Sequence, residues 1–296
     1  MFTFWRYFAL ICLFHAMIFA SSTSHKGKKG KGQKRIEARD DYHNFGSSWD
    51  RSPPGGNEAS KGQFPYVVSV QYWGFHYCSG ALVSPKWVVS SGQCFSSRRG
   101  SVTGLTLVAG MVNVTDPKVE ERNLSKIIMH AKYYIDDKCK LLASDIALLQ
   151  PATEFPLTRA IKLVKLPTPK ETFHGKGKLI GWTSHKYGII SLKYVDAVIL
   201  TPRECRQSQG DWPVNIGYAY HNKSMVCAKP LNSPTALCVG NTGSPLLFDD
   251  VLVGLSSTGA NPCKANSGKE FIGFYTKISR YVTFIKKYIK GIILDD

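Results

Sequence analysis

The sequence predicts an all-β protein, built as a β-sandwich or as a pair of β-barrels. From Gly62 onward, short segments rich in β-branched and aromatic residues alternate with turns at regular spacing. Only one segment, near the C-terminus, has the apolar spacing of a helix. The chain has 296 residues, which allows one large domain or two ordinary ones with a full core. An aromatic content of 12% argues against general disorder.

The expected strands follow one another along most of the chain. They are 64–73, 81–90, 105–110, 125–134, 145–151, 177–182, 193–200, 244–248, 251–257 and 271–278. The expected helix covers 279–290, with Ser279 as its cap and Gly291 at its end. One face of this helix is apolar and carries Tyr281, Phe284, Ile285, Tyr288 and Ile289.

Residues 1–20 have the pattern of a cleaved secretory signal peptide. Arg6 precedes an almost unbroken apolar run that ends at Ala20, followed by small residues. The alternative is an uncleaved membrane anchor, but the apolar run is shorter than the roughly 20 residues that span a bilayer. We therefore expect a secreted, extracellular protein without a membrane span, whose cysteines outside the signal lie in an oxidising compartment.

Residues 21–51 are expected to form a flexible basic arm or pro-region. They contain eight basic and four acidic residues, within a formal net charge of +17 for the whole chain. The basic run consists of Lys26, Lys28, Lys29, Lys31, Lys34 and Arg35. A secreted context favours heparin-like polyanions over nucleic acid as its partner, and a solvated tail without a specific partner is the alternative.

Several strings in unbroken order resemble the chymotrypsin-like and trypsin-like serine proteases. They are 57–94, SDIALLQP at 144–151, GW at 181–182, CVGNTGSPL at 238–246 and FYTKISRYVTFI at 274–285. The resemblance implies a domain at 52–296 made of two six-stranded antiparallel β-barrels. Barrel one would cover about 57–165 and barrel two about 166–278, with the helix against the second barrel.

The cysteines alone leave the disulfide pairing open, because six cysteines allow 15 connectivities. The resemblance implies the bridges Cys78–Cys94, Cys205–Cys227 and Cys238–Cys263. Cys139 then has no family partner. It is an exposed thiol, an intermolecular bridge, or a half-buried cysteine without function.

The resemblance places Gln93, Asp145 and Thr242 at the positions of the catalytic histidine, aspartate and serine. Only Asp145 keeps the family's residue type. Gln93 is a neutral amide that cannot take up a proton near neutral pH, and without a base the Thr242 hydroxyl stays weakly nucleophilic. Two histidines, His76 and His185, are the candidate replacement bases; His76 fits a structural role better, and His185 belongs to no motif, so we expect no rearranged triad.

The activation machinery of the family also departs from its pattern. SPPGG at 52–56 replaces the usual new N-terminus, and Asn241 replaces the aspartate that pairs with it. Cleavage after Arg35 or Arg51 stays open. We expect a zymogen-like or fixed state, in which Asn241 lies near His76.

The binding groove of the family maps onto a small set of positions. The pocket-like residues are Ala236, Thr258, Gly259 and Gly273, and the oxyanion-hole donors would be Gly240 and Thr242. No acid stands at the pocket base. Thr258 replaces a tryptophan, and Ser244 replaces a glycine. We therefore expect the groove to bind a peptide less well than the groove of an active protease does.

Three sequons, at Asn113, Asn123 and Asn222, are possible glycosylation sites in a secreted chain. The histidines form no metal-binding pattern, and no calcium-loop spacing occurs, so we assign no metal and no cofactor.

Together these features predict a secreted, catalytically inactive serine protease homologue that acts by binding proteins, among them active serine proteases. Such homologues are common in insects, in haemolymph and reproductive secretions, as cofactors, decoys or scaffolds. The absence of a cysteine-rich clip module favours other fluids, such as seminal fluid. The alternatives are a weak hydrolase that uses Thr242 and a polyanion-binding extracellular protein.

Overall fold

A computed structural model describes residues 56–98, 100–136, 141–184, 190–210, 220–231, 242–259 and 272–295. The predicted signal peptide and basic arm, Cys139 and the predicted Cys238–Cys263 bridge lie outside these residues.

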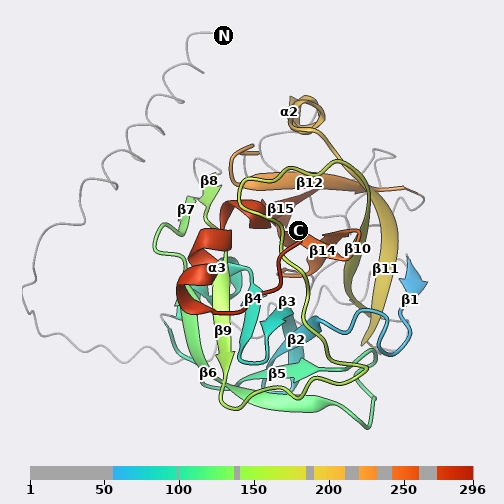
Figure 1. The fold of residues 1–296 in the computed structure, drawn as a ribbon, viewed down its shortest axis with the longest axis vertical. Coiled ribbons are helices and arrows are strands. Elements are labelled where there is room, and N and C mark those ends of the chain that lie inside the picture. The colour runs from blue at the N-terminus through green and yellow to red at the C-terminus, as the bar shows by residue number, and fades with distance from the viewer. Residues whose placement is uncertain are drawn as a thin grey trace, which may run out of the picture. The chain divides into compact units, whose positions relative to one another are not determined.

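The first barrel is closed by six antiparallel strands in the order β2-β3-β4-β9-β6-β5 (Figure 1). Its strands are β2 (Val67–Tyr72), β3 (Phe75–Ser84), β4 (Trp87–Ser90), β5 (Leu105–Ala109), β6 (Glu120–Met129) and β9 (Ala147–Pro151). Apolar side chains from all six strands fill the interior, including Val68, Leu82 and Leu149, none of which is exposed to solvent. Burial of these β-branched and aliphatic side chains is the main stabilisation of the barrel.

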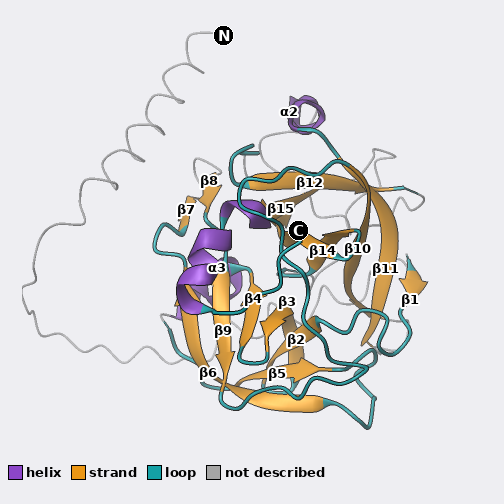
Figure 2. Ribbon diagram, viewed as in Figure 1, coloured by secondary structure: helices purple, strands orange, loops and turns teal. Residues whose placement is uncertain are grey.

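The second barrel is formed by β10 (Gly175–Ser184), β11 (Ile190–Ile199), β12 (Met225–Pro230), β13 (Pro245–Phe248), β14 (Val251–Gly259) and β15 (Gly273–Lys277). Pairing between β11 and β12 closes the ring, and β1 (Asn57–Glu58) adds to the outer edge of β11. Strands dominate the described chain (Figure 2). The prediction of two six-stranded antiparallel barrels is therefore confirmed.

A shared apolar cluster joins the two barrels. It contains Ile146 from the first barrel, Trp182 and Leu247 from the second, and Ile285 from the C-terminal helix. The chain segments that carry the candidate site meet beside this cluster, because residue 145 directly precedes the buried Ile146.

The C-terminal helix is shorter than predicted. A 3₁₀ turn, η4 (Ile278–Arg280), comes first, and α3 runs over Val282–Tyr288. Ser279 does not cap α3, because its hydroxyl donates to the carbonyl oxygen of Glu171 at 2.7 Å. Gly291 has a φ of 71° but lies beyond the helix end at Tyr288. The residues of the predicted apolar face are buried at Tyr281, Ile285 and Ile289, whereas Tyr288 is 38% exposed.

Some elements differ from the sequence prediction. The segment 81–90 contains the end of β3 and all of β4, with a turn at Pro85 and Lys86. A helix, α2 (Pro202–Gly210), and a two-stranded sheet of β7 (Tyr134–Asp136) and β8 (Leu141–Ala143) were not predicted. A further 3₁₀ helix, η2 (Gly92–Arg98), follows β4.

Within the part of the chain that the structure describes, two disulfides hold η2 and α2 onto the barrels. Cys78 of β3 pairs with Cys94 of η2, and Cys205 of α2 pairs with Cys227 of β12. The first bridge fixes η2, and thus Gln93, against the first barrel.

Candidate functional site

The centre of the site is the carboxylate of Asp145, which is 3% exposed between the two barrels. Oδ1 accepts the backbone N–H of Gln93 at 2.6 Å. Oδ2 accepts the hydroxyl of Ser91 at 2.6 Å and also the hydroxyl of Ser257. The backbone N–H of Gly92 is a further donor. The carboxylate is thus enclosed by donors from β14 and from the segment that leads into η2.

Burial raises the pKa of Asp145 above its ordinary value, and the hydrogen bonds from Ser257, Ser91 and the two backbone N–H groups oppose that rise. The backbone is anchored as well, since the hydroxyl of Thr276 donates to the Asp145 carbonyl oxygen at 2.8 Å. The serine hydroxyls are therefore what makes an ionised carboxylate tolerable at this depth.

Gln93 is positioned by this network through its backbone and not through its amide. Its side chain is half-buried, and within the described residues no hydrogen bond is formed by that amide. The Ser91 hydroxyl instead donates to Oδ2 of the carboxylate, the group that orients the imidazole in a catalytic triad.

Thr242 lies beside the same segment. Its carbonyl oxygen accepts the backbone N–H of Ser79 at 2.8 Å, and the Cys94 sulfur lies 3.9 Å from that oxygen. The structure thus brings Gln93, Asp145 and Thr242 to one region. None of these three side chains is an imidazole.

The turn after Thr242 requires glycine. Gly243 has a φ of 84°, and a Cβ there would lie 2.1 Å from the carbonyl oxygen of Ser79. Its N–H donates to the Ser256 carbonyl at 2.7 Å. Ser244, which follows, is 3% exposed and accepts the Ser256 N–H at 2.7 Å. The backbone that carries Thr242 is therefore clamped between the barrels.

The surroundings of His76 are those of a buried structural side chain. It is 4% exposed, its Nδ1 lies 2.8 Å from the Ser69 hydroxyl, and its ring centroid is 5.4 Å from that of Trp182. The other candidate base, His185, and the expected partner Asn241 lie outside the described residues.

The pocket-like positions are described only in part. Gly259 pairs with Gly273 across β14 and β15. A Cβ on Gly273 would lie 2.9 Å from the hydroxyl oxygen of Tyr275, so the Tyr275 ring covers this glycine. Thr258 belongs to β14. Gly240 and Ala236 lie outside the described residues.

Two serines and one tyrosine of this site were not singled out from the sequence. Ser91 lies in the string 57–94 that carried the resemblance, Ser257 ends the expected strand 251–257, and Tyr275 follows Gly273 by two residues. The sequence does place each serine close to a predicted site position. That both hydroxyls donate to Asp145 depends on how the two barrels pack.

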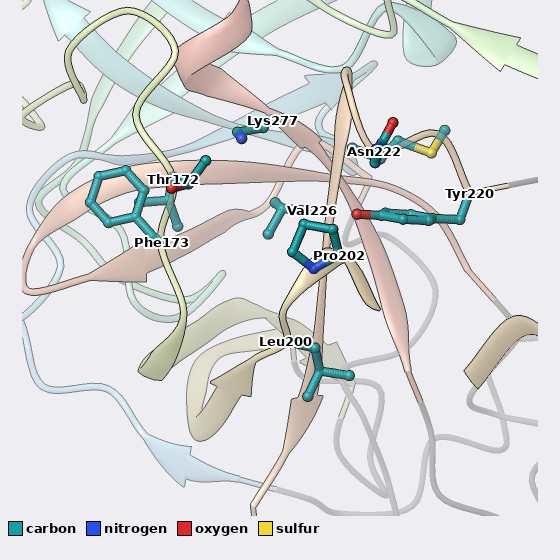
Figure 3. Close-up of a pocket in the computed structure, with 10 residues that line it drawn as sticks. Thr172, Phe173, Leu200, Pro202, Tyr220, Asn222, Val226 and Lys277 are labelled. Carbon is teal, nitrogen blue, oxygen red and sulfur yellow. The ribbon is translucent and has the colours of Figure 1, made fainter. Parts of the chain in front are cut away.

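A separate pocket of about 30 Å³ lies in the second barrel (Figure 3). In this view Phe173 and the Tyr220 ring lie on opposite sides, with Val226 and Pro202 between them, and Lys277 also lines the pocket. Burial lowers the pKa of Lys277. The volume holds about two water molecules, so we assign no ligand to it. Within the described ranges, no three His, Cys, Asp or Glu side chains gather as a metal site.

The three sequons differ in their surroundings. Asn123 lies in β6, and Asn222 precedes β12; both side chains are exposed. Asn113 is half-buried, and its Oδ1 accepts the Thr115 hydroxyl at 3.3 Å. Asn123 and Asn222 are therefore the more accessible acceptors.

Comparison with known proteins identifies the family. The family model described as Trypsin matches residues 53–285. The chain belongs to the trypsin family. Human serine protease 1 is 29% identical over 239 residues, which cover 79% of this chain and 88% of the relative. A trypsin of Squalus acanthias is 28% identical, with 80% and 96% of the two chains covered.

The fold is also similar to that of solved structures. Neuropsin, a serine protease of mouse brain, has a TM-score of 0.65 and 25% identity, over 79% of this chain and 99% of its own. A structure titled human heparin binding protein has a TM-score of 0.62 and 21% identity, over 82% and 99%. The latter likeness is one of fold. Within the described residues, no helix of this trypsin-family chain is long and apolar enough to cross a membrane.

Proposed function

We propose that this trypsin-family chain does not hydrolyse peptide bonds and acts by binding other secreted proteins, as a cofactor, decoy or scaffold. The observation that carries the proposal is the enclosure of Asp145 by two serine hydroxyls and the backbone N–H of Gln93. These donors satisfy the carboxylate without a histidine. Like the insect homologues that it resembles, the protein would work in a secreted fluid such as haemolymph or seminal fluid.

The chemistry supports the same proposal. Peptide hydrolysis in this fold needs a base that takes the proton of the nucleophile and returns it to the leaving amine. The Gln93 amide does neither near neutral pH. Loss of triad members lowers turnover by about four to six orders of magnitude. The predicted secretion signal and the degenerate activation segment, both outside the described residues, fit this interpretation.

A binding surface lies close to the site, at the hairpin between β2 and β3. Trp73 is 63% exposed and Phe75 is 68% exposed, the two largest exposures among the large apolar residues of the described chain. Aromatic side chains and arginine are enriched at the energetic centres of protein interfaces. The hydroxyl of Tyr77, two residues after Phe75, donates to the Cys94 carbonyl at 2.7 Å, which ties this hairpin to η2.

The hairpin is held rigidly. Trp73 has a φ of 50°, and its N–H donates to the Gly104 carbonyl at 2.8 Å. The indole lies so close to Gly104 that a Cβ there would be 2.6 Å from its Cε2. The Arg98 guanidinium lies 4.1 Å from the centroid of the Tyr72 ring. A prearranged aromatic surface binds with a smaller entropic cost than a mobile loop.

Affinity capture from the native fluid tests the binding proposal, with the full chain as bait. We expect a specific partner that is lost when Trp73 and Phe75 are both changed to Ser. The matched control changes Leu157 and Leu231 to Ser, which are 53% and 43% exposed elsewhere on the molecule. Equal capture by both double variants would reject the hairpin as the docking surface.

A second candidate function is the binding of anionic polysaccharides through the predicted arm. It is favoured by the net charge of +17 and by the fold likeness to a structure titled human heparin binding protein. Deletion of 26–35 should then lower retention on heparin. Unchanged retention would remove the arm as the binding segment.

A further inference from the structure

The surface around α3 concentrates positive charge without compensation. Residues 278–290 contain four basic residues and no Asp or Glu. Two more lysines come from neighbouring loops, since Lys132 follows β6 and the backbone N–H of Lys170 donates to the Ser279 carbonyl at 3.0 Å. We call this set the α3 basic surface: Lys132, Lys170, Arg280, Lys286, Lys287 and Lys290.

All six side chains of the α3 basic surface are exposed, and none forms an ion pair within the described residues. Two carboxylates close to them in sequence are already engaged. Glu171 accepts the Thr168 hydroxyl at 2.8 Å, and Asp295 lies 3.5 Å from Lys165. The positive field of this surface is therefore directed to solvent.

We propose that the α3 basic surface binds a sulfated polysaccharide. It adds a site on the folded body to the anionic-polysaccharide candidate above, and it does not depend on the basic arm. The helix α3, Val282–Tyr288, is about 10 Å long at helical rise, and Arg280 and Lys290 lie just beyond its two ends, which gives an extended ridge for a linear polyanion.

The composition of the surface favours this ligand over three others. Five of the six charges are lysines, which act as point charges, whereas specific phosphate and nucleic-acid recognition favours the planar fork of arginine. Protein interfaces and membrane surfaces need exposed apolar anchors, and the helix offers only Tyr288, which is 38% exposed. The Lys287 ammonium lies 5.4 Å from the centroid of that ring.

The pKa of His130 can report binding at the α3 basic surface. Its ring lies 5.3 Å from the Tyr281 ring and 4.9 Å from the Phe284 ring, measured between centroids. Burial lowers the pKa of His130, and the charges of Lys132 and Arg280 lower it further. An anion bound across these two cations would offset their effect, so the pKa of His130 should rise on binding.

Binding of a size-defined heparin oligosaccharide to the full chain tests the proposal. We expect Lys286→Gln, Lys287→Gln and Lys290→Gln together to weaken binding by about tenfold or more at 0.15 M salt. The slope of log affinity against log salt should fall by about 2 to 3, since each of the three lost contacts contributes about 0.7 to 0.9. NMR titration of His130 should show its pKa rising with the oligosaccharide.

The matched control removes the same three charges from another part of the surface, at Lys118, Arg159 and Lys162, which are also exposed. We expect less than about a threefold effect there. An equal loss in both variants would overturn the proposal, because binding would then follow net charge alone. An unchanged pKa of His130 on binding would also overturn it.

Two further comparisons distinguish this proposal from a site on the basic arm and from other anionic ligands. Loss of binding only when 26–35 is deleted would place the site on the arm, so the polysaccharide function would stand while the α3 surface would be rejected. Tighter binding to phosphatidylserine vesicles, duplex DNA or an acidic peptide than to the oligosaccharide, at equal salt, would overturn the ligand class. Equally tight binding of desulfated heparin would also overturn the ligand class.

Discussion

Replacement of Ser91 by Ala removes one of the two hydroxyl donors to Asp145 Oδ2. Ser91 has no solvent exposure, so water does not substitute for the lost donor. A hydrogen bond to a charged group contributes about 1.5 to 3 kcal/mol, and we expect Ser91→Ala to lower the free energy of unfolding by that amount at pH 7. The adjacent Ser90 is the matched control, because it is equally buried and donates to the neutral carbonyl of Ser79 at 2.6 Å. Ser90→Ala should cost about 0.5 to 1.5 kcal/mol.

The two variants should also differ in their pH dependence. Burial raises the pKa of Asp145 in the folded chain, so protonation of this carboxyl favours folding. Its contribution is present below the unfolded pKa and is lost as pH rises through the folded pKa. Ser91→Ala raises the folded pKa further, so the loss should become larger and extend to higher pH, whereas the effect of Ser90→Ala should not depend on pH. Urea unfolding at several pH values measures both. Equal, pH-independent effects of the two variants would refute the role given to Ser91.

Asp145→Asn should leave the free energy of unfolding at pH 7 within about 1 kcal/mol of the parent, because the amide pairs with the same neighbours and no buried charge remains; a large loss in urea unfolding would contradict this. Gly243→Ala should lower stability by more than about 1 kcal/mol in the same assay, and Gly100→Ala, where φ is 85° and nothing lies within 4 Å, should cost less. Gln93→His combined with Thr242→Ser should give no turnover of peptide substrates, because the serine hydroxyls already occupy the carboxylate; recovered turnover would show that the site accepts an imidazole.

The barrel strands could be predicted because their period and composition reflect burial in a closed sheet. The apolar pattern did not predict the helix α2, because its sequence PRECRQSQG has no apolar face. The signal that the sequence did carry is the capping box of Thr201 and Glu204: Glu204 Oε2 accepts the Thr201 N–H at 2.7 Å, and the Thr201 hydroxyl accepts the Glu204 N–H at 3.3 Å. The disulfide from Cys205 to Cys227, rather than a helical pattern, holds it to the second barrel.

The positions of the candidate site residues could be predicted from the sequence, but the hydrogen bonds between them could not. Asp145, Gln93 and Thr242 follow from family strings in the sequence. The donor from Ser257 comes from a strand of the other barrel, 112 residues away, and its direction depends on how the barrels pack. For the same reason, the capping role expected for Ser279 was wrong: tertiary contact with Glu171 satisfies its hydroxyl instead.

The central claim is that this trypsin-family chain binds without hydrolysing. Hydrolysis of peptide and ester substrates by the chain cut after Arg51, compared with its Thr242→Ala variant, tests that claim most directly. We predict the same turnover for both, at the level of the uncatalysed reaction. Turnover by the parent chain that Thr242→Ala abolishes would contradict the claim.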